Sequence, residues 1–249
     1  MVARTDLTSD PDLLDQLLTV RRGTAFWHRK VDELTDAELD EPSLLNGWSR
    51  RHLIAHVGYN ARAVGRLVLW ANTGVEHPMY SSPEARSTEI DLGASMPARA
   101  LRHLNHHAAV SLNVEWRDSP DEAWSHQVRT AQGRTVPMSE TVWMRTREVW
   151  LHAVDLDNGA RVSDIPENVL ERLLSDVLAI WKTRGTDPGF AIHVTDRPDL
   201  GTLGGGGDSG GDSSAQTIRG DLAAVVSWAS GRRASGLETG TRVSPPRWL

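Results

Sequence analysis

A glutamate and a histidine stand four residues apart, at Glu148 and His152, in a stretch whose apolar residues recur with helical spacing. Residues at positions i and i+4 of a helix project from the same face, so these two side chains can reach one metal ion. The pair alone is weak, because a chain with ten histidines gives such a match by chance about as often as not. A solvated pair on a helix surface is the simpler interpretation, and a third ligand is needed to favour a metal site.

The candidate for that third ligand is His56, in a segment that follows Ser49, a residue type that often precedes the first turn of a helix. The apolar residues of this segment recur with helical periodicity, and His56 falls on their inward-facing stripe. Spacing favours His56 over His52, one turn earlier, but either could be an ordinary core or surface histidine. With Glu148 and His152, a histidine here completes a His₂Glu set, which is typical of catalytic zinc and also suits non-haem iron.

Other polar residues could support such a site. Asp155 follows His152 by three residues and could orient its imidazole, although an exposed carboxylate near a helix end is equally consistent with the spacing. A guanidinium binds a carboxylate through a planar set of donors, so arginines are candidates for holding an anionic substrate. The pattern alone selects none of the candidates, which are Arg86, Arg145, Arg147 and Arg232.

The elements that must position these residues can be read from apolar periodicity. Helices are predicted over about 10–34, 49–72, 97–117 and 139–156, with a shorter one near 84–92. The four long segments, each with one apolar stripe, predict a four-helix bundle. Polar residues around Gly133 predict a small hairpin or an irregular connection over 125–136.

The pattern changes after a fifth predicted helix that ends near residue 184. Strands are predicted over 190–195 and 215–219, and a short helix over 221–230. The Gly-rich segment 204–214 lacks the lysine and the helix of a phosphate-binding loop, which favours a flexible hairpin tip. We therefore predict a mainly α protein with a helical domain over 1–162 and a small α+β domain over 163–249.

Composition excludes several classes of function. The net charge of −6 and the pI near 5.9 argue against a nucleic-acid-binding protein. There is no cysteine, so disulfides, thiolate ligands and a cysteine nucleophile are all excluded, and thiol chemistry would need a borrowed thiol. The N-terminus lacks the pattern of a signal peptide, and no apolar run approaches the roughly 20 residues of a membrane span. We expect a cytoplasmic protein.

With these residues identified, nearly the whole chain resembles the mycothiol-dependent maleylpyruvate isomerases of the DinB-like metal-binding superfamily. The stretches that carry the resemblance are 43–60, 78–86, 130–137 and, most specifically, 143–156, with the sequence WMRTREVWLHAVDL. The resemblance implies a DinB-like bundle followed by a C-terminal domain similar to sterol carrier protein. The longer Gly-rich loop is a departure that leaves only the geometry of that loop in doubt.

The resemblance also implies roles for particular residues. The metal ligands of the family fall on His56, Glu148 and His152, which decides against His52. Two active-site arginines of the family fall on Arg86 and Arg232. Since Arg232 lies in the C-terminal part, the implied site is between the two domains. The cofactors implied are a divalent metal, expected to be zinc, and mycothiol.

The reaction implied is the cis to trans isomerisation of maleylpyruvate to fumarylpyruvate, a step in aromatic breakdown through gentisate. Thiolate addition would turn the double bond into a single bond, and elimination would follow rotation. We expect a monomer with small-molecule partners and no nucleic-acid or membrane partner. The alternatives are a mycothiol S-transferase acting on other electrophiles, and a non-catalytic carrier of small molecules.

Overall fold

The computed structural model describes residues 5–186, 189–204, 216–239 and 244–248. It divides into two compact units, Met1–Ala160 and Arg161–Leu249. The domain boundary predicted from sequence, after residue 162, lies close to this division. The loop predicted over 204–214 lies outside the described residues, apart from Gly204.

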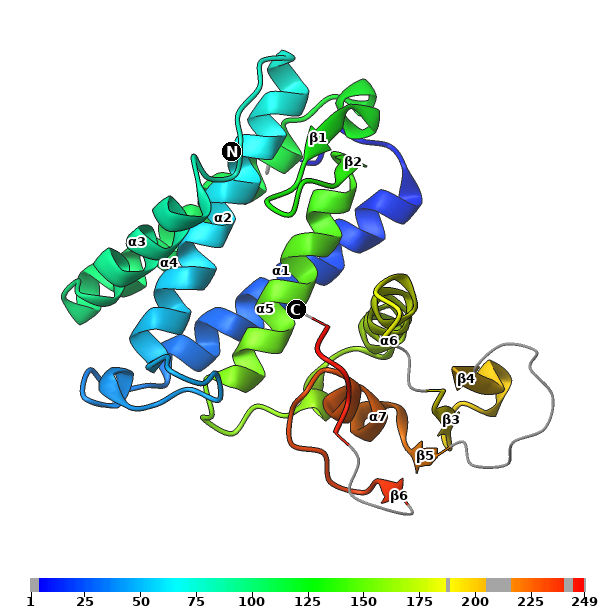
Figure 1. Ribbon diagram of the computed structural model, residues 1–249. Coiled ribbons are helices and arrows are strands. Elements are labelled where there is room, and N and C mark those ends of the chain that lie inside the picture. Colours follow the sequence, from blue (N-terminus) through cyan, green and yellow to red (C-terminus); the bar gives the residue numbers. More distant parts are fainter. Residues whose placement is uncertain (1–4, 187–188, 205–215, 240–243, 249) are drawn as a thin grey trace. The chain divides into compact units, whose positions relative to one another are not determined.

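The first unit is a bundle of helices (Figure 1). Its helices are α1 (Pro11–Asp32), α2 (Arg50–Thr73), α3 (Pro83–Ala94), α4 (Ala98–Arg117) and α5 (Glu140–Asp155), with the 3-10 turns η1 (Glu38–Asp40) and η2 (Asp121–Ser125). Helix α2 packs on α3, α4 and α5, and α1 packs mainly on α5. The predicted mainly α fold is confirmed. Within the described residues, no helix has the length and apolar character needed to cross a membrane.

Local chemistry explains where these helices begin and end. The Asp10 carboxylate accepts hydrogen bonds from the backbone N–H groups of Asp12 and Leu13, so it caps the free donors of the first turn of α1. Helix α2 ends at Gly74, whose φ of 71° is left-handed and whose N–H donates to the carbonyl of Trp70. Glycine adopts this conformation without steric cost, which makes it a common helix terminator.

A short hairpin separates α4 from α5. Strand β1 (Gln127–Arg129) pairs antiparallel with β2 (Thr135–Pro137), and the connection passes through Gly133, which has a φ of 82°. The hairpin expected in this region is confirmed.

A buried polar cluster ties three helices of the bundle together. Asn105, on α4, is completely buried and accepts a hydrogen bond of 2.6 Å from Trp27 Nε1, on α1. Its amide Nδ2 donates to the carbonyl of Ile54, on α2, also at 2.6 Å. Because a buried polar group without a partner is costly, this amide selects one arrangement of α1, α2 and α4.

We expect Asn105→Ala to lower the free energy of unfolding by about 3 kcal/mol, because it leaves the Trp27 indole N–H unpaired and opens a cavity. Urea unfolding followed by far-UV circular dichroism measures this loss. Ser111→Ala, at an exposed position of the same helix, is the control and should change stability by less than about 0.5 kcal/mol. A loss of similar size in both variants would contradict the role given to Asn105.

The second unit combines helices with a small sheet. Its helices are α6 (Glu167–Thr183) and α7 (Leu222–Ala229), with the 3-10 turns η3 (Val162–Asp164) and η4 (Pro198–Leu200). The strands are β3 (Ala191–Val194), β4 (Thr202–Gly204), β5 (Thr217–Gly220) and β6 (Glu238–Thr239), in the order β4-β3-β5-β6. Strands β3 and β5 are parallel, while β4 and β6 pair antiparallel at the edges.

The core of this unit includes an aromatic cluster. Trp181 of α6 meets Phe190 and Trp228 edge to face, with ring centroids 6.5 and 5.7 Å away.

Strands β3 and β5 and helix α7 were predicted, whereas β4 and β6 were not, because segments of two or three residues carry no measurable alternation. The likeness of this unit to sterol carrier protein stays a prediction.

Candidate metal centre

Three side chains with metal-binding atoms converge between α2 and α5. His56 comes from α2, and Glu148 and His152 lie one turn apart on α5. One ligand atom from each residue lies within 4.8 Å of the other two. Glu148 Oε2 is 3.0 Å from His56 Nε2 and 3.1 Å from His152 Nε2. The predicted ligands therefore form one compact His₂Glu group in the described part of the chain.

The register of α2 decides which of its histidines belongs to this group. His56 is only 6% exposed and faces α5. The Nδ1 atom of His52 instead shares a hydrogen bond of 2.8 Å with the Ser49 hydroxyl. Its Nε2 atom lies 4.0 Å from the carboxylate of Asp91. His52 is thus outside the group. Ser49 precedes α2 as expected, although its hydroxyl caps no backbone N–H.

Asp155 contacts His152 on the side of the imidazole that faces away from Glu148. Its carboxylate is fully buried and lies 2.9 Å from His152 Nδ1, which excludes the alternative of an exposed carboxylate. The Nδ1–H of His152 donates to Asp155, so Nε2 is the nitrogen that faces Glu148. A carboxylate that fixes the orientation of an imidazole in this way is the usual companion of a metal-bound histidine. This observation fits a divalent cation held by His56, Glu148 and His152.

The protonation of the three groups follows from their mutual contacts. Burial disfavours the charged carboxylate of Glu148, but hydrogen bonds from His152 and His56 outweigh it and hold its pKa well below the usual value. Burial lowers the pKa of His56, although Glu148 opposes this shift. For His152, burial is again unfavourable to the charged form, yet Asp155 and Glu148 raise its pKa to about 9. The metal-free group therefore carries a proton on His152 at neutral pH.

That proton predicts a pH dependence of metal binding. Coordination requires an unprotonated Nε2, so below pH 9 each ion that binds must displace one proton from His152. We expect the apparent affinity for zinc to fall about tenfold for each pH unit from about pH 8 to about pH 6. Competition with a chelator of known pH dependence measures it. An affinity that stays constant over this range would contradict the protonation given to His152.

Arg86 lies directly beside the group. This residue of α3 has Nη2 3.3 Å from His56 Nδ1. A guanidinium only donates, so Nδ1 accepts and the imidazole proton stands on Nε2, where it donates to Glu148. Two further residues near the group were not singled out from sequence. The Tyr80 hydroxyl interacts with Arg86, and the Trp48 ring centroid lies 5.3 Å from that of His56.

The other candidate arginines lie elsewhere. Arg145, on α5, is buried and lines a pocket between α1 and α4. Arg147 is half-buried on α5. Arg232 belongs to the second unit, follows α7 and donates through Nη1 to the carbonyl of Ser230 at 3.2 Å. A role for Arg86 and Arg232 in catalysis stays a prediction.

Comparisons with known proteins agree on one family. The family described as "Mycothiol maleylpyruvate isomerase N-terminal domain" matches residues 20–157. A solved structure of a mycothiol-dependent maleylpyruvate isomerase is 44% identical, with a TM-score of 0.89, and the match covers 98% of this chain and 100% of that one. A mutant of that isomerase with a histidine replaced by alanine matches equally well. No curated protein sequence matches. The chain therefore belongs to the mycothiol maleylpyruvate isomerase family.

Proposed function

We propose that this chain is an enzyme that isomerises maleylpyruvate to fumarylpyruvate, with mycothiol as its thiol cofactor. The observation that supports this most strongly is the end-to-end match, at 44% identity, to a structure named as a mycothiol-dependent maleylpyruvate isomerase. The absence of cysteine agrees with it, because the nucleophilic thiol must then come from a small molecule. In finer detail, we propose that the enzyme is a cytoplasmic monomer and that its metal is zinc.

His56, Glu148 and His152 would hold the metal, because they form a His₂Glu group with one oriented imidazole. Bound there, a divalent cation supplies stabilisation of a thiolate at neutral pH, and mycothiol supplies the nucleophile that makes a double bond temporarily single. Asp155 keeps Nε2 of His152 directed at the group through the bond to Nδ1. The Trp48 ring lies beside His56, with its centroid 5.3 Å from that of the imidazole.

Arg86 would bind the substrate. With Nε2 of His56 serving as a ligand, the imidazole proton stands on Nδ1, so Arg86 can no longer donate to that nitrogen. Its guanidinium is then available for a substrate carboxylate beside the metal ligands. Burial raises the pKa of Tyr80, despite the opposing effect of Arg86, so its hydroxyl stays protonated and can donate a hydrogen bond there. Arg232 would hold the second carboxylate and stabilise the negative charge that develops on the substrate after thiolate addition.

The test adds mycothiol and maleylpyruvate to the zinc-loaded enzyme and follows the ultraviolet absorbance of the keto acid together with the free thiol. We expect conversion that depends on both zinc and mycothiol, while the amount of free thiol stays constant. An S-transferase would consume one thiol per turnover with an electrophile. Conversion without thiol, or none with zinc and thiol present, would overturn the proposed function.

A further inference from the structure

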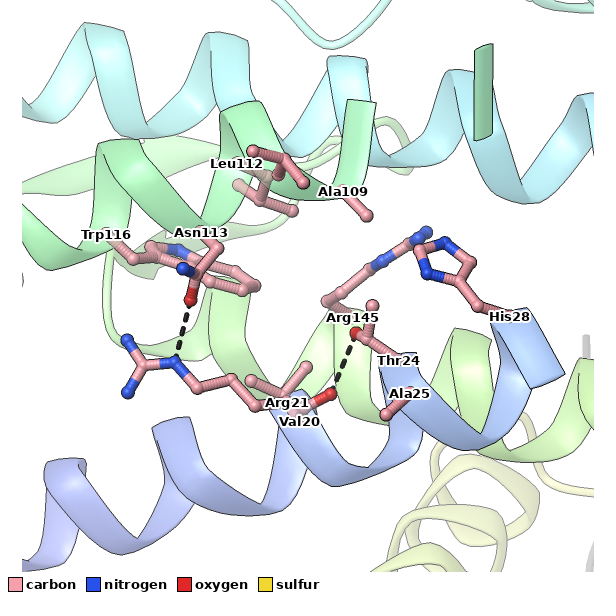
Figure 2. Close-up of a pocket in the computed structure, with 11 residues that line it drawn as sticks. Val20, Arg21, Thr24, Ala25, His28, Ala109, Leu112, Asn113, Trp116 and Arg145 are labelled. Carbon is pink, nitrogen blue, oxygen red and sulfur yellow. Dashed lines mark hydrogen bonds between the residues drawn. The ribbon is translucent and has the colours of Figure 1, made fainter. Parts of the chain in front are cut away.

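A pocket lies between α1 and α4, and none of the proposed metal ligands lines it (Figure 2). Its volume is about 260 Å³. Much of its wall is apolar, and the residues that matter here are Val20, Ala25, Ala109, Leu112, Trp116 and Arg145. A cavity of about 150 Å³ already accommodates benzene, so the size suits a small organic molecule.

Arg145 supplies a buried cation to this pocket. It extends from α5 and is only 1% exposed. Its Nη1 donates to the Val57 carbonyl at 2.7 Å and to Asn60 Oδ1 at 2.9 Å, both neutral acceptors on α2. Its Nη2 has no hydrogen-bond partner within the described residues. Burial lowers the pKa of Arg145 to about 10, with Glu148 opposing, so the guanidinium is still charged at neutral pH.

His28 lies at the polar end of the pocket, beside Arg145. Figure 2 shows its ring beside the Arg145 guanidinium, and its Nε2 also lacks a partner among the described residues. Burial, with smaller contributions from His106 and Arg145, lowers the pKa of His28 to about 4. The ring is therefore neutral at physiological pH, and the positive charge at this end comes from Arg145.

Burying a charged group costs free energy unless an opposite charge or a hydrogen-bonding group compensates for the lost hydration. Arg145 forms no ion pair in the part of the chain that the structure describes. An anionic group at the Arg145 end of the pocket would balance this charge, and a planar carboxylate matches a guanidinium geometrically. The apolar wall would at the same time bury the body of the molecule.

We propose that the pocket between α1 and α4 binds a small carboxylate with an apolar body, whose carboxylate pairs with Arg145. None of the proposed metal ligands lines this pocket, although Glu148 acts electrostatically on Arg145, and the ligand differs from a polar dicarboxylate because most of the wall is apolar. Binding in this pocket is independent of the isomerase reaction.

The test titrates the zinc-loaded full chain with 4-fluorobenzoate and follows binding by fluorine NMR. We expect saturable binding, and binding of the neutral 4-fluorobenzamide that is weaker by about tenfold or more, because only the carboxylate pairs with the cation. Arg145→Met should weaken 4-fluorobenzoate binding to a similar degree. Failure of benzoate to bind, or equal binding of the amide, would overturn the proposal.

A second variant locates the probe if Arg145→Met does not fold. Ala25→Trp fills the pocket from an exposed position of α1, so it should abolish binding without disturbing the core. Ala100→Trp, the same substitution at an exposed position of α4 that does not line the pocket, should bind as the natural sequence does. Unchanged binding in Ala25→Trp would overturn the proposal, since the probe would then occupy another place, such as the metal group.

Discussion

Glu148→Gln is expected to lose its metal and with it the isomerase activity. Glutamine has nearly the shape of glutamate and can still accept hydrogen bonds from the two imidazoles that now contact Glu148 Oε2, so the bundle should fold. It lacks the negative charge with which Glu148 would bind a divalent cation. Loss of a supporting partner of a ligand already costs about 10- to 100-fold in metal affinity, so loss of the ligand should cost more than about 100-fold.

Zinc content after gel filtration and turnover with mycothiol and maleylpyruvate measure this effect. The matched control is Glu140→Gln, the same substitution two turns earlier on α5 and outside the ligand group. It should keep both zinc and turnover. His152→Ala should behave as Glu148→Gln does. Full zinc occupancy with unchanged turnover in Glu148→Gln would contradict the assignment of the ligands.

The parts of the site that lie on helices could be predicted from sequence. Helical periodicity fixes the direction of a side chain relative to the apolar stripe, and this placed His56 inward together with the pair on α5. The same reasoning could not exclude His52 as the third ligand, because residues one turn apart share a face of the helix. Only packing shows that His52 is tied to Ser49 at the edge of α2.

The contributions of connecting segments could not be predicted in this way. Trp48 and Tyr80 precede α2 and α3, in segments without periodicity, so nothing in the local pattern says where their side chains point. Asp155 was ambiguous for another reason. Its spacing from His152 is compatible with a solvated helix end, and its complete burial depends on what packs over the end of α5.

Arg145 shows a different limit of sequence reasoning. Among the arginines of a chain, most are exposed, so the pattern offers no reason to bury this one. The structure places it in the lining of a pocket, where neutral acceptors of α2 satisfy one of its nitrogens and another has no hydrogen-bond partner among the described residues. Such an arrangement depends on the limited contact between α1 and α4, which is a property of the packed bundle.

Arg232→Ala is expected to lower kcat/KM by about 100- to 1,000-fold while zinc content stays the same. The reason is chemical: loss of one donor that stabilises a developing negative charge typically costs about this much. Arg232 is also far in sequence from the ligands and belongs to the second unit, so its removal leaves the ligand group intact. Steady-state kinetics and metal analysis of the same preparation measure the two quantities together.

The neighbouring residue provides a matched control. Arg233 is exposed, and Arg233→Ala removes the same charge from the same segment, so it should retain normal kinetics. Arg232→Lys keeps the charge but not the two-pronged donor set, and it should recover only part of the lost rate. If Arg232→Ala and Arg233→Ala lose the same small fraction of activity, the effect is general electrostatics. If Arg232→Ala loses zinc, the residue supports the fold or the ligands and does not bind substrate.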